Sequence, residues 1–322
     1  MKVWVDNIIF KLQKHGGIST YFENLYTNFP DKVNLISDYG EDISRLRAKL
    51  LLLKKLNLEY SNNSIFHSSY YRILNKPHIP SVMTIHDMFP EEKSPYNLQA
   101  LLKYRSLRAT NGLIFPSYYT RRMFEKFYSN YTDLPFKVIH HGFNIDSNIE
   151  SIGGIPEKFI LFLGGGAPYK NYEYAKNISI ELDIPLVSTG YIEEEIHPKI
   201  YFLGSIKRAQ INYLLSRAEM LIFPSDNEGF GIPIIEAQAH GCPVLAFGGG
   251  SIPEVLGSDY PLRFEHDQSN YLIAARKLMK SRQLKNEIIE QGLQNCKRFS
   301  WNKSKIQHLK FYGELINDYR WR

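Results

Sequence analysis

Two glutamates eight positions apart are the residues whose spacing points most directly to chemistry. Glu228 and Glu236 lie in the stretch Phe-Pro-Ser-Asp-Asn-Glu-Gly-Phe-Gly-Ile-Pro-Ile-Ile-Glu, which runs from residue 223 to residue 236. Each carboxylate accepts hydrogen bonds at both oxygens, which suits it to sugar hydroxyls. A helix turns once in about 3.6 residues, so two carboxylates flanking one helix start could address two parts of one extended ligand.

The residues around these glutamates are typical of a strand that turns sharply into a helix. An apolar strand over Met220–Pro224 is followed by a polar turn, and Pro233 suits the first turn of the helix that begins there. Gly229 and Gly231 let the backbone approach a ligand, and N–H groups at a helix start attract phosphate. Ligands of open α/β sheets bind beyond the carboxyl ends of the strands, so we expect a binding site here.

The stretch from Glu228 to Val244 resembles the E-x7-E signature of the retaining GT-B glycosyltransferases of family 4, also called glycosyl transferases group 1. The resemblance implies that Glu228 contacts hydroxyls of the donor sugar and that Glu236 contacts the nucleotide ribose. It also implies that the donor is approached by the backbone of Gly229, Phe230, Gly231 and Ile232. The alternative is a tight strand-to-helix turn with two solvated glutamates.

A second glycine-rich stretch, Gly-Gly-Gly-Ala-Pro-Tyr-Lys-Asn from residue 164 to residue 171, follows an apolar strand. It matches neither the dinucleotide-binding nor the Walker A pattern. It resembles the glycine-to-Arg-Lys-Asn segment of the same family, which implies that Lys170 neutralises the leaving diphosphate and that Gly165 lies against the donor. Gly165 and Tyr169 stand where arginines are common. The resemblance also places the base near Ser205. A solvated surface lysine is the alternative for Lys170.

His86 and Asp87 follow a predicted strand over Val82–Ile85. A lone histidine is more often structural than catalytic, but this one stands at the carboxyl end of a strand. In the family that the chain resembles, a His-Asp pair at this place puts its histidine against the transferred sugar. We therefore expect His86 in the active site, and we give Asp87 less weight.

Gly16 and Gly17 follow the first predicted strand and open a helix. Glycines before a helix start can form an anion site. The resemblance implies that this pair lies against the donor diphosphate and the acceptor, although many relatives have arginine where this chain has Thr20. A simple turn is the alternative.

Short apolar strands alternate with amphipathic stretches along the chain, which favours a parallel α/β architecture. The pattern breaks over residues 141–156, which have the composition of a loop, and then restarts. Predicted strands are Val3–Val5, Val33–Ile36, Ser64–His67, Val82–Ile85, Gly112–Phe115, Lys137–Ile139, Phe159–Leu163, Pro185–Ser188, Ile200–Leu203, Met220–Pro224 and Pro243–Phe247. Predicted helices are Ser19–Asn28, Asp42–Leu56, Leu98–Ala109 and Ser117–Ser129.

The restart predicts two Rossmann-like domains, and the resemblance adds that they face each other across a cleft. We expect an acceptor domain over residues 1–150 and a donor domain over residues 151–300. Residues 301–322 are expected to form a terminal helix that crosses back to the first domain.

The composition of the 322 residues is that of a globular protein, with 43% hydrophobic and 22% charged residues. Cys242 and Cys296 are the two cysteines, which argues against a disulfide framework and favours a reducing cytoplasm. No apolar run approaches the roughly 20 residues that span a bilayer. The net charge of +6 favours anionic partners, and no basic run is dense enough to indicate nucleic acid.

Basic residues alternate with leucines between Arg45 and Lys55. This pattern is typical of a basic amphipathic helix on the inner face of a membrane, where a polyprenyl-diphosphate-linked acceptor would lie. It is equally typical of a helix with a buried apolar stripe and solvated lysines.

The resemblance implies a retaining hexosyltransferase that moves a hexose or deoxyhexose from a nucleotide diphosphate sugar to a glycan or lipid-linked glycan. A mannose-type donor in surface polysaccharide synthesis is favoured. No Asp-x-Asp occurs in a plausible donor loop, so we expect no metal or other cofactor. The alternatives are a sugar-nucleotide epimerase of GT-B fold and a non-catalytic nucleotide-sugar binding protein.

Overall fold

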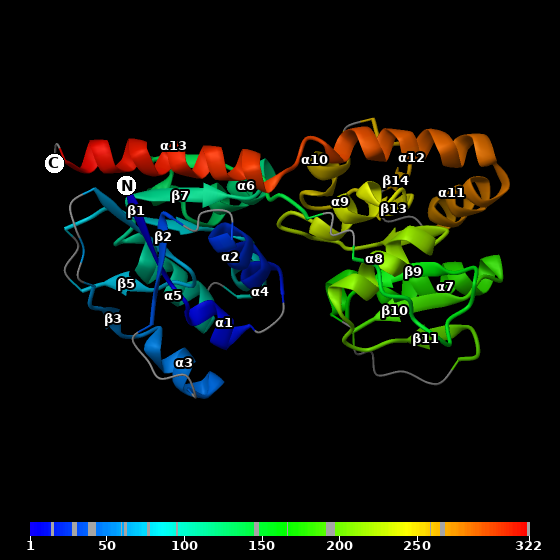
Figure 1. Cartoon of the computed structure of the whole chain (residues 1–322), viewed down its shortest axis with the longest axis horizontal. Helices are drawn as coiled ribbons and strands as arrows, with labels where there is room; N and C mark the ends of the chain where they lie inside the picture. The colour runs from blue at the N-terminus through cyan, green and yellow to red at the C-terminus, as the bar shows by residue number, and fades with distance from the viewer. Residues whose placement is uncertain are drawn as a thin grey trace. The chain divides into compact units, whose positions relative to one another are not determined.

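The chain is described by a computed structural model and divides into two α/β units (Figure 1). The amino-terminal unit contains Met1–Gly142 and Trp301–Arg322, and the carboxy-terminal unit contains Phe143–Ser300. The structure describes residues 1–13, 16–27, 31–37, 43–58, 60, 63–75, 78–94, 96–144, 148–165, 167–190, 197–257, 259–264 and 268–320. Phe143, Ile152 and Ile155 pack against the core of the carboxy-terminal unit, so the division falls eight residues before the predicted boundary.

The amino-terminal unit is built on a parallel sheet of six strands in the order β2-β1-β4-β6-β7-β8. The strands β4, β6 and β7 are buried along their whole length, as expected of a sheet covered on both faces. The strands are β1 (Lys2–Asp6), β2 (Val33–Ile36), β4 (Ser64–Ser68), β6 (Ser81–Thr84), β7 (Gly112–Phe115) and β8 (Phe136–Val138). A separate pair is formed by β3 (Lys55–Leu56) and β5 (Ile73–Leu74).

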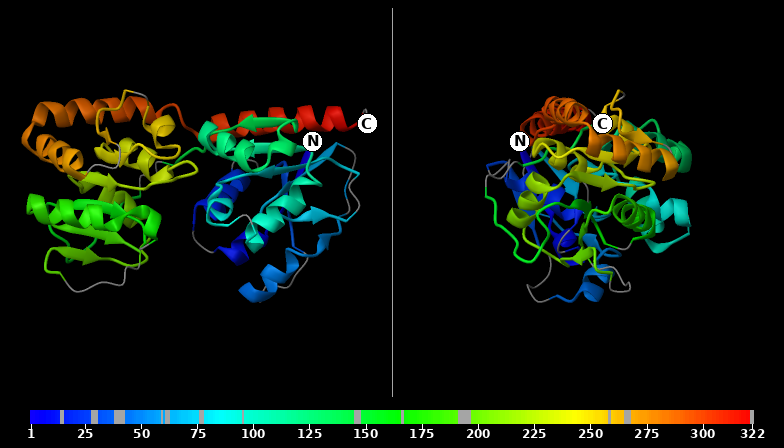
Figure 2. Two further views of the ribbon diagram at one scale, coloured as in Figure 1. Left: turned by 180° about the vertical axis from the view of Figure 1, so that it is seen from behind. Right: turned by 90° about the vertical axis from the view of Figure 1, so that its right-hand side faces the viewer.

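Helices cover this sheet, and the terminal helix α13 (Trp301–Arg320) runs along it in both Figure 1 and Figure 2. Phe311, Tyr312 and Leu315 of α13 are buried in the core beside Tyr21 of α2. The other helices of the unit are α1 (Ile8–Leu12), α2 (Gly17–Thr27), α3 (Arg45–Leu51), α4 (Phe89–Lys93), α5 (Leu98–Leu107), α6 (Tyr118–Phe127) and the short η1 (Ser129–Tyr131).

The carboxy-terminal unit repeats this plan with a parallel sheet in the order β11-β10-β9-β12-β13-β14. Its strands are β9 (Ile160–Leu163), β10 (Leu186–Thr189), β11 (Ile200–Phe202), β12 (Met220–Phe223), β13 (Val244–Phe247) and β14 (Arg263–Phe264). Its helices are η2 (Pro168–Lys170), α7 (Tyr172–Leu182), α8 (Arg208–Arg217), α9 (Ile232–Ala239), α10 (Ile252–Leu256), α11 (Gln268–Lys280) and α12 (Arg282–Cys296).

Most of the predicted strands lie where the sequence indicates, with ends that move by one or two residues. The predicted helix over Asp42–Leu56 is wrong in length, because α3 ends at Leu51 and Lys55–Leu56 pair with β5. The start of that prediction, at Asp42, lies outside the described residues. None of the described helices is long and apolar enough to cross a membrane.

Strand order determines where each unit can hold a ligand. In the carboxy-terminal sheet β9 lies beside β12. The chain continues from β9 to β10 on one side of the sheet, and from β12 to β13 on the other side. Open α/β sheets bind ligands at such a switch point, beyond the carboxyl ends of the strands. The loops that follow β9 and β12 hold Lys170 and Glu228, respectively.

Candidate functional site

Lys170 and Glu228 meet at the switch point of the carboxy-terminal unit. The Lys170 Nζ atom lies 4.0 Å from Glu228 Oε1, and the two side chains are about one-fifth exposed, at 20% and 18%. The sequence separates these residues by 58 positions, and the parallel pairing of β9 with β12 brings their loops together. A cation and a carboxylate therefore share one partly buried place at the switch point.

Asn171 ties the lysine loop to the glutamate loop. Its side-chain amide donates a hydrogen bond to the Pro224 carbonyl at 2.9 Å and another to the carboxylate of Asp226. The Asp226 N–H in turn donates to the Tyr169 carbonyl at 2.9 Å. Asn171 adopts a left-handed conformation with φ of 51°, which asparagine tolerates better than most residues. The Tyr-Lys-Asn sequence thus has a structural reason, since it fixes Lys170 beside Glu228.

The glycine-rich segment Gly248–Ser251, which follows β13, also contacts the glutamate loop. The Ser251 Oγ donates to the carbonyls of Glu228 and Phe230, at 2.8 and 2.9 Å, and the Ser251 N–H also donates to the Glu228 carbonyl. Gly250 has φ of +62°, and a Cβ atom there would lie 2.6 Å from the Glu228 backbone nitrogen. Only glycine at position 250 allows this close approach.

Glu236 lies inside α9 and has its own cation. Its carboxylate is 2.6 Å from the Arg208 guanidinium of α8, and its side chain is 9% exposed. Burial raises the pKa of Glu236, while Arg208 and then His240 act in the opposite direction. Gly231, with φ of +96°, is the left-handed N-cap of α9, so the helix starts directly after the glutamate turn. The structure therefore gives the two glutamates different partners.

The other donor-site predictions fall on the loops of this unit. Gly165 backbone atoms lie against Gly190, where an added Cβ atom would come within 2.8 Å. Ser205 is exposed in the loop between β11 and α8, beside Gly204, which pairs with Gly190. Gly229 and Phe230 belong to the glutamate turn, and Ile232 begins α9.

His86 lies just beyond the carboxyl end of β6 in the amino-terminal unit. Its ring is partly exposed, but its Nε2 atom is buried and has no hydrogen-bond partner within the described part of the chain. Burial lowers the pKa of His86 to about 3, with contributions from His67 and Lys103. The imidazole is therefore neutral near pH 7, where it can make hydrogen bonds but carries no positive charge.

A buried set of aromatic and histidine side chains surrounds His86. Tyr21 packs edge-on against it with ring centroids 4.9 Å apart. The Tyr21 hydroxyl is 2.6 Å from His308 Nε2 and 3.1 Å from Thr84 Oγ1. His67 reaches the same Thr84 hydroxyl at 2.9 Å. These contacts link α13, α2 and β4 to Thr84 of β6, the strand that His86 follows.

Gly16 and Gly17 stand at the start of α2, which also carries Tyr21. The Gly16 carbonyl accepts hydrogen bonds from the Thr20 N–H and the Ser19 hydroxyl, both at 3.0 Å. The Gln13 side chain caps the helix start by accepting from the Ser19 N–H at 3.2 Å. The helix start and His86 are thus connected through Tyr21 within one unit.

Asp87 has a local structural role. Its carboxylate accepts a hydrogen bond from the Phe89 N–H at 3.2 Å, which shapes the turn into α4. Burial raises the pKa of Asp87, and Lys103 opposes that shift. Lys103, Asn171 and Arg208 were not predicted from the sequence as site residues. Asn171 directly follows Lys170 and could have been found there, whereas the long-range contacts of the other two leave no pattern in the sequence.

Most of the carboxy-terminal unit matches a known protein family. Residues 191–295 match the family of glycosyl transferases group 1. The chain is 29% identical over 116 residues to O-antigen chain mannosyltransferase B of Escherichia coli, a match covering 36% of this chain and 30% of that enzyme. It is 26% identical over 250 residues to O-antigen chain mannosyltransferase RfbU of Salmonella typhimurium, covering 70% and 69%.

A solved structure extends the likeness to both units. Anabaena Alr3699/HepE in complex with UDP-glucose aligns with a TM-score of 0.73 and 17% identity, over 98% of this chain and all of that chain. At this identity the alignment bears on the fold alone. The predicted family resemblance and the fold class of two Rossmann-like domains are confirmed.

Proposed function

We propose that this chain, a group 1 glycosyltransferase with the GT-B fold, moves a hexose or deoxyhexose from a nucleotide diphosphate sugar to a glycan or lipid-linked glycan. A mannose-type donor and a role in surface polysaccharide synthesis are supported by the two O-antigen mannosyltransferases that the chain resembles. The UDP-glucose bound by HepE supports a nucleotide sugar as the donor class.

The observation that carries this proposal is the placement of Lys170 within 4.0 Å of Glu228 at the switch point. When the bond between the anomeric carbon and the diphosphate breaks, negative charge develops on the leaving oxygen. The Lys170 ammonium would stabilise that charge, and N–H groups at the start of α9 would add to it. Glu228 would hold hydroxyls of the departing sugar, and Glu236 would hold the ribose.

The proposed reaction retains the configuration of the sugar. The acceptor hydroxyl attacks the anomeric carbon from the side that the diphosphate leaves, and its proton passes to the departing phosphate oxygen. His86 would hold the transferred sugar by a hydrogen bond, since its imidazole is neutral near pH 7. Gly16 and Gly17 would contribute N–H groups toward the diphosphate and the acceptor.

We also propose that the reaction needs no metal ion, because Lys170 and the helix start supply positive charge at the leaving group. The assay is transfer in the presence of EDTA. Unchanged rates would support the proposal, and a loss of activity that a divalent ion restores would overturn it.

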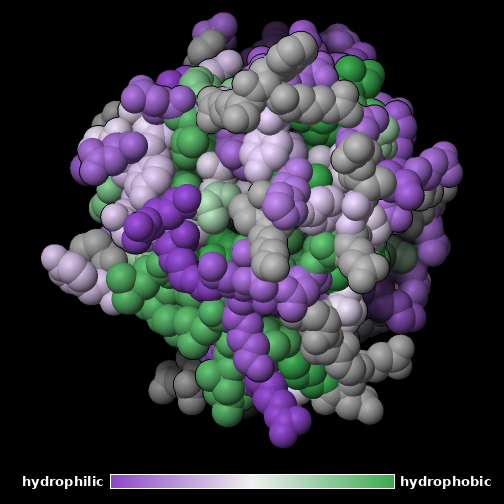
Figure 3. All heavy atoms as spheres, turned by 90° about the vertical axis from the view of Figure 1, so that its left-hand side faces the viewer, coloured by the Kyte–Doolittle hydropathy of each residue, from purple (hydrophilic) through white to green (hydrophobic). Residues whose placement is uncertain are grey.

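An anionic membrane surface is proposed as a further partner of the amino-terminal unit. Leu46, Leu50 and Leu53 are all more than half exposed, at 70%, 55% and 56%, beside the exposed Arg45 and Lys49. Figure 3 shows apolar side chains gathered on the lower part of this unit, where α3 lies, with hydrophilic ones between them. Flotation with anionic but not neutral vesicles would support this, and absence from both fractions would remove it.

The experiment that tests the proposed function is a donor screen with purified protein. GDP-, UDP- and dTDP-sugars are each offered with and without a lipid-linked glycan acceptor, and both free nucleotide and labelled product are measured. Acceptor-dependent product with retained anomeric configuration supports the proposal. Epimerised donor without acceptor would indicate the epimerase instead. Binding without any turnover would indicate a non-catalytic binding protein.

A further inference from the structure

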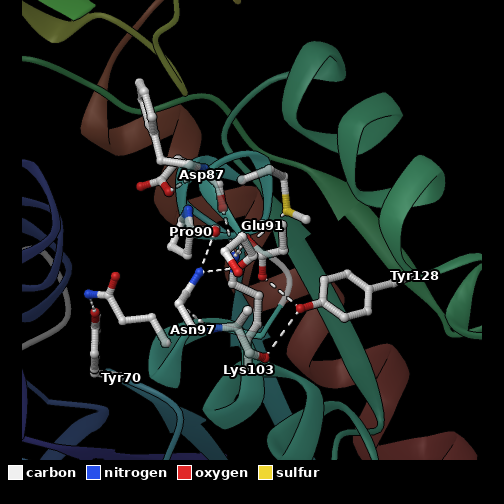
Figure 4. Close-up of polar contacts among 12 residues, drawn as sticks. Tyr70, Asp87, Pro90, Glu91, Asn97, Lys103 and Tyr128 are labelled. Atoms are coloured by element: carbon white, nitrogen blue, oxygen red, sulfur yellow. Dashed lines mark hydrogen bonds and ion pairs between the residues drawn. The ribbon is translucent and has the colours of Figure 1, made fainter. Parts of the chain in front are cut away.

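A fully buried ion pair lies behind the turn that carries His86. Lys103 of α5 and Glu91 of α4 are 2.8 Å apart, with side-chain exposures of 0% and 2%. Figure 4 shows the side chains of Glu91 and Lys103 beside each other, with Asp87 above them and Tyr128 to their right. Neither residue has a part in the proposed reaction.

The Lys103 ammonium also holds the backbone of the turn. It donates a hydrogen bond to the Asp87 carbonyl at 2.9 Å, and its third close neighbour is the Met88 sulfur at 3.7 Å. The carbonyl of Asp87 belongs to the residue directly after His86. One buried cation therefore fixes the main chain next to the candidate active-site histidine.

Both oxygens of the Glu91 carboxylate accept hydrogen bonds. One carboxylate oxygen accepts from Lys103 and the other accepts from the Tyr128 hydroxyl at 2.6 Å (Figure 4). Tyr128 follows α6 and also contacts the Ala100 carbonyl at 3.3 Å. The Lys103–Glu91 pair thus connects α4, α5 and the end of α6, and Lys103 alone contacts the main chain at Asp87.

Stability alone does not account for this arrangement. Removing two opposite charges from water is costly, and an apolar pair of similar volume is often as stable or more stable. An apolar pair, however, could not donate a hydrogen bond to the Asp87 carbonyl. The feature that the ion pair adds is a fixed position for the main chain beside His86.

We propose that Lys103 and Glu91 are positioning residues, which hold the His86–Asp87 turn so that the imidazole faces the transferred sugar. The proposal rests on the proposed function of His86. Lys103 acts through the Asp87 carbonyl, and Glu91 acts by keeping the Lys103 ammonium in place. Neither side chain touches the substrate.

The test is the paired variant Lys103→Met with Glu91→Leu, because Lys103→Met alone leaves a buried carboxylate without its cation, which is strongly destabilising. We expect the paired variant to keep a melting temperature close to that of the wild type. Its kcat should fall about tenfold, since misplacing His86 cannot weaken transfer more than removing it does. Its KM for the donor should stay within about twofold, because Lys103 and Glu91 touch no substrate and the donor contacts proposed for Lys170, Glu228 and Glu236 are unchanged.

The matched control is Lys285→Met with Glu219→Leu. This pair is 2.6 Å apart, with side-chain exposures of 29% and 23%. Glu219 directly precedes β12 and so lies at the amino end of that strand, whereas the candidate site lies beyond the carboxyl end. The control should keep the wild-type kcat. Tyr128→Phe, which removes one hydrogen bond from Glu91, should lower kcat by less than the paired variant.

The outcomes separate this proposal from the proposed function. Wild-type transfer with a folded Lys103/Glu91 variant of unchanged kcat would overturn the positioning role and leave the glycosyltransferase assignment intact. A parallel fall in kcat and melting temperature would also overturn it, because it would show a structural role only. Lack of transfer by the wild type with every donor would instead count against the proposed function.

Discussion

The regions beyond β6 and beyond β9 and β12 lie at the carboxyl ends of parallel strands in two sheets of similar plan, yet they are built from opposite chemistry. Around His86 the side chains are buried and mostly neutral, and they are held by hydrogen bonds such as that between Tyr21 and His308 at 2.6 Å. Around Glu228 the groups are charged and mostly only partly buried, with Lys170 and Arg208 each facing a carboxylate.

Under the proposed function, the two regions would have different roles in the transfer reaction. A neutral, desolvated wall can hold a sugar without attracting ions, whereas paired charges suit a diphosphate whose charge changes during the reaction. The buried ion pair of Lys103 and Glu91 lies behind this wall and not on it.

The largest effect is expected on the charged side. Lys170→Ala and Glu228→Gln should each lower kcat by about 100-fold or more, as loss of a group that stabilises developing charge does. Lys176→Ala, which changes a lysine of α7 that pairs with Glu173 on the helix surface, is the matched control and should be silent. Steady-state kinetics on variants with wild-type circular dichroism measure this, and wild-type rates would remove these residues from the mechanism.

A smaller effect is expected from the neutral wall. His86→Ala should lower kcat/KM about tenfold to a hundredfold, the range for losing one hydrogen bond to a reacting group. Because the pKa of His86 is about 3, its protonation should add no inflection to the wild-type rate between pH 5 and pH 8. An inflection in this range that disappears in His86→Ala would contradict the neutral role.

A still smaller effect on the kinetics is expected from substitution of Arg208. Arg208→Ala leaves the Glu236 carboxylate without its cation and raises the pKa of Glu236 further. The donor KM should rise about fivefold to tenfold while kcat changes little, as for a group that binds ground state and transition state equally. A change confined to kcat would instead place Arg208 at the reacting bond.

The smallest effect is expected on the acid stability of the amino-terminal unit. The ordinary pKa of histidine is 6.5, and burial lowers that of His308 to about 4. The unfolded chain therefore binds more protons between pH 6.5 and pH 4, so stability is complete above this window and declines as pH falls through it. The slope is about 1.4 kcal/mol per pH unit for each such histidine. Calorimetry from pH 7.5 to pH 5 should show it.

The control for acid stability is a histidine that faces solvent. His308→Gln should flatten the decline in melting temperature, whereas His78→Gln, at an exposed position, should leave it unchanged. Equal slopes in all three proteins would contradict the view that the buried neutral histidines respond to acid.

The sequence predicts the frame of this molecule better than its contacts. Gly112–Phe115 was predicted at its observed bounds, because a continuous apolar run between turn residues defines a buried strand. Val33–Ile36 was also predicted at its observed bounds, although Asn34 interrupts its apolar run and none of its residues is fully buried. The short α4 and the β3–β5 pair were missed, since two to five residues carry too little periodicity.

The candidate site shows the same limit. Strand ends and glycines indicate where Lys170, Glu228 and His86 lie, because motifs occupy fixed places on parallel sheets. That Arg208 faces Glu236, or that Lys103 lies under Asp87, depends on side chains meeting across helices distant in sequence. Local residue patterns hold no information on those encounters.

The central claim is that Lys170 and Glu228 converge on a sugar diphosphate, and nucleotide affinity tests it most directly. Calorimetric titration compares wild type and Lys170→Met with a nucleoside diphosphate and with the matching monophosphate, using the base that the donor screen selects. The account predicts that the variant binds the diphosphate about tenfold or more weakly and the monophosphate almost normally. Equal affinities of the two proteins for the diphosphate would contradict it.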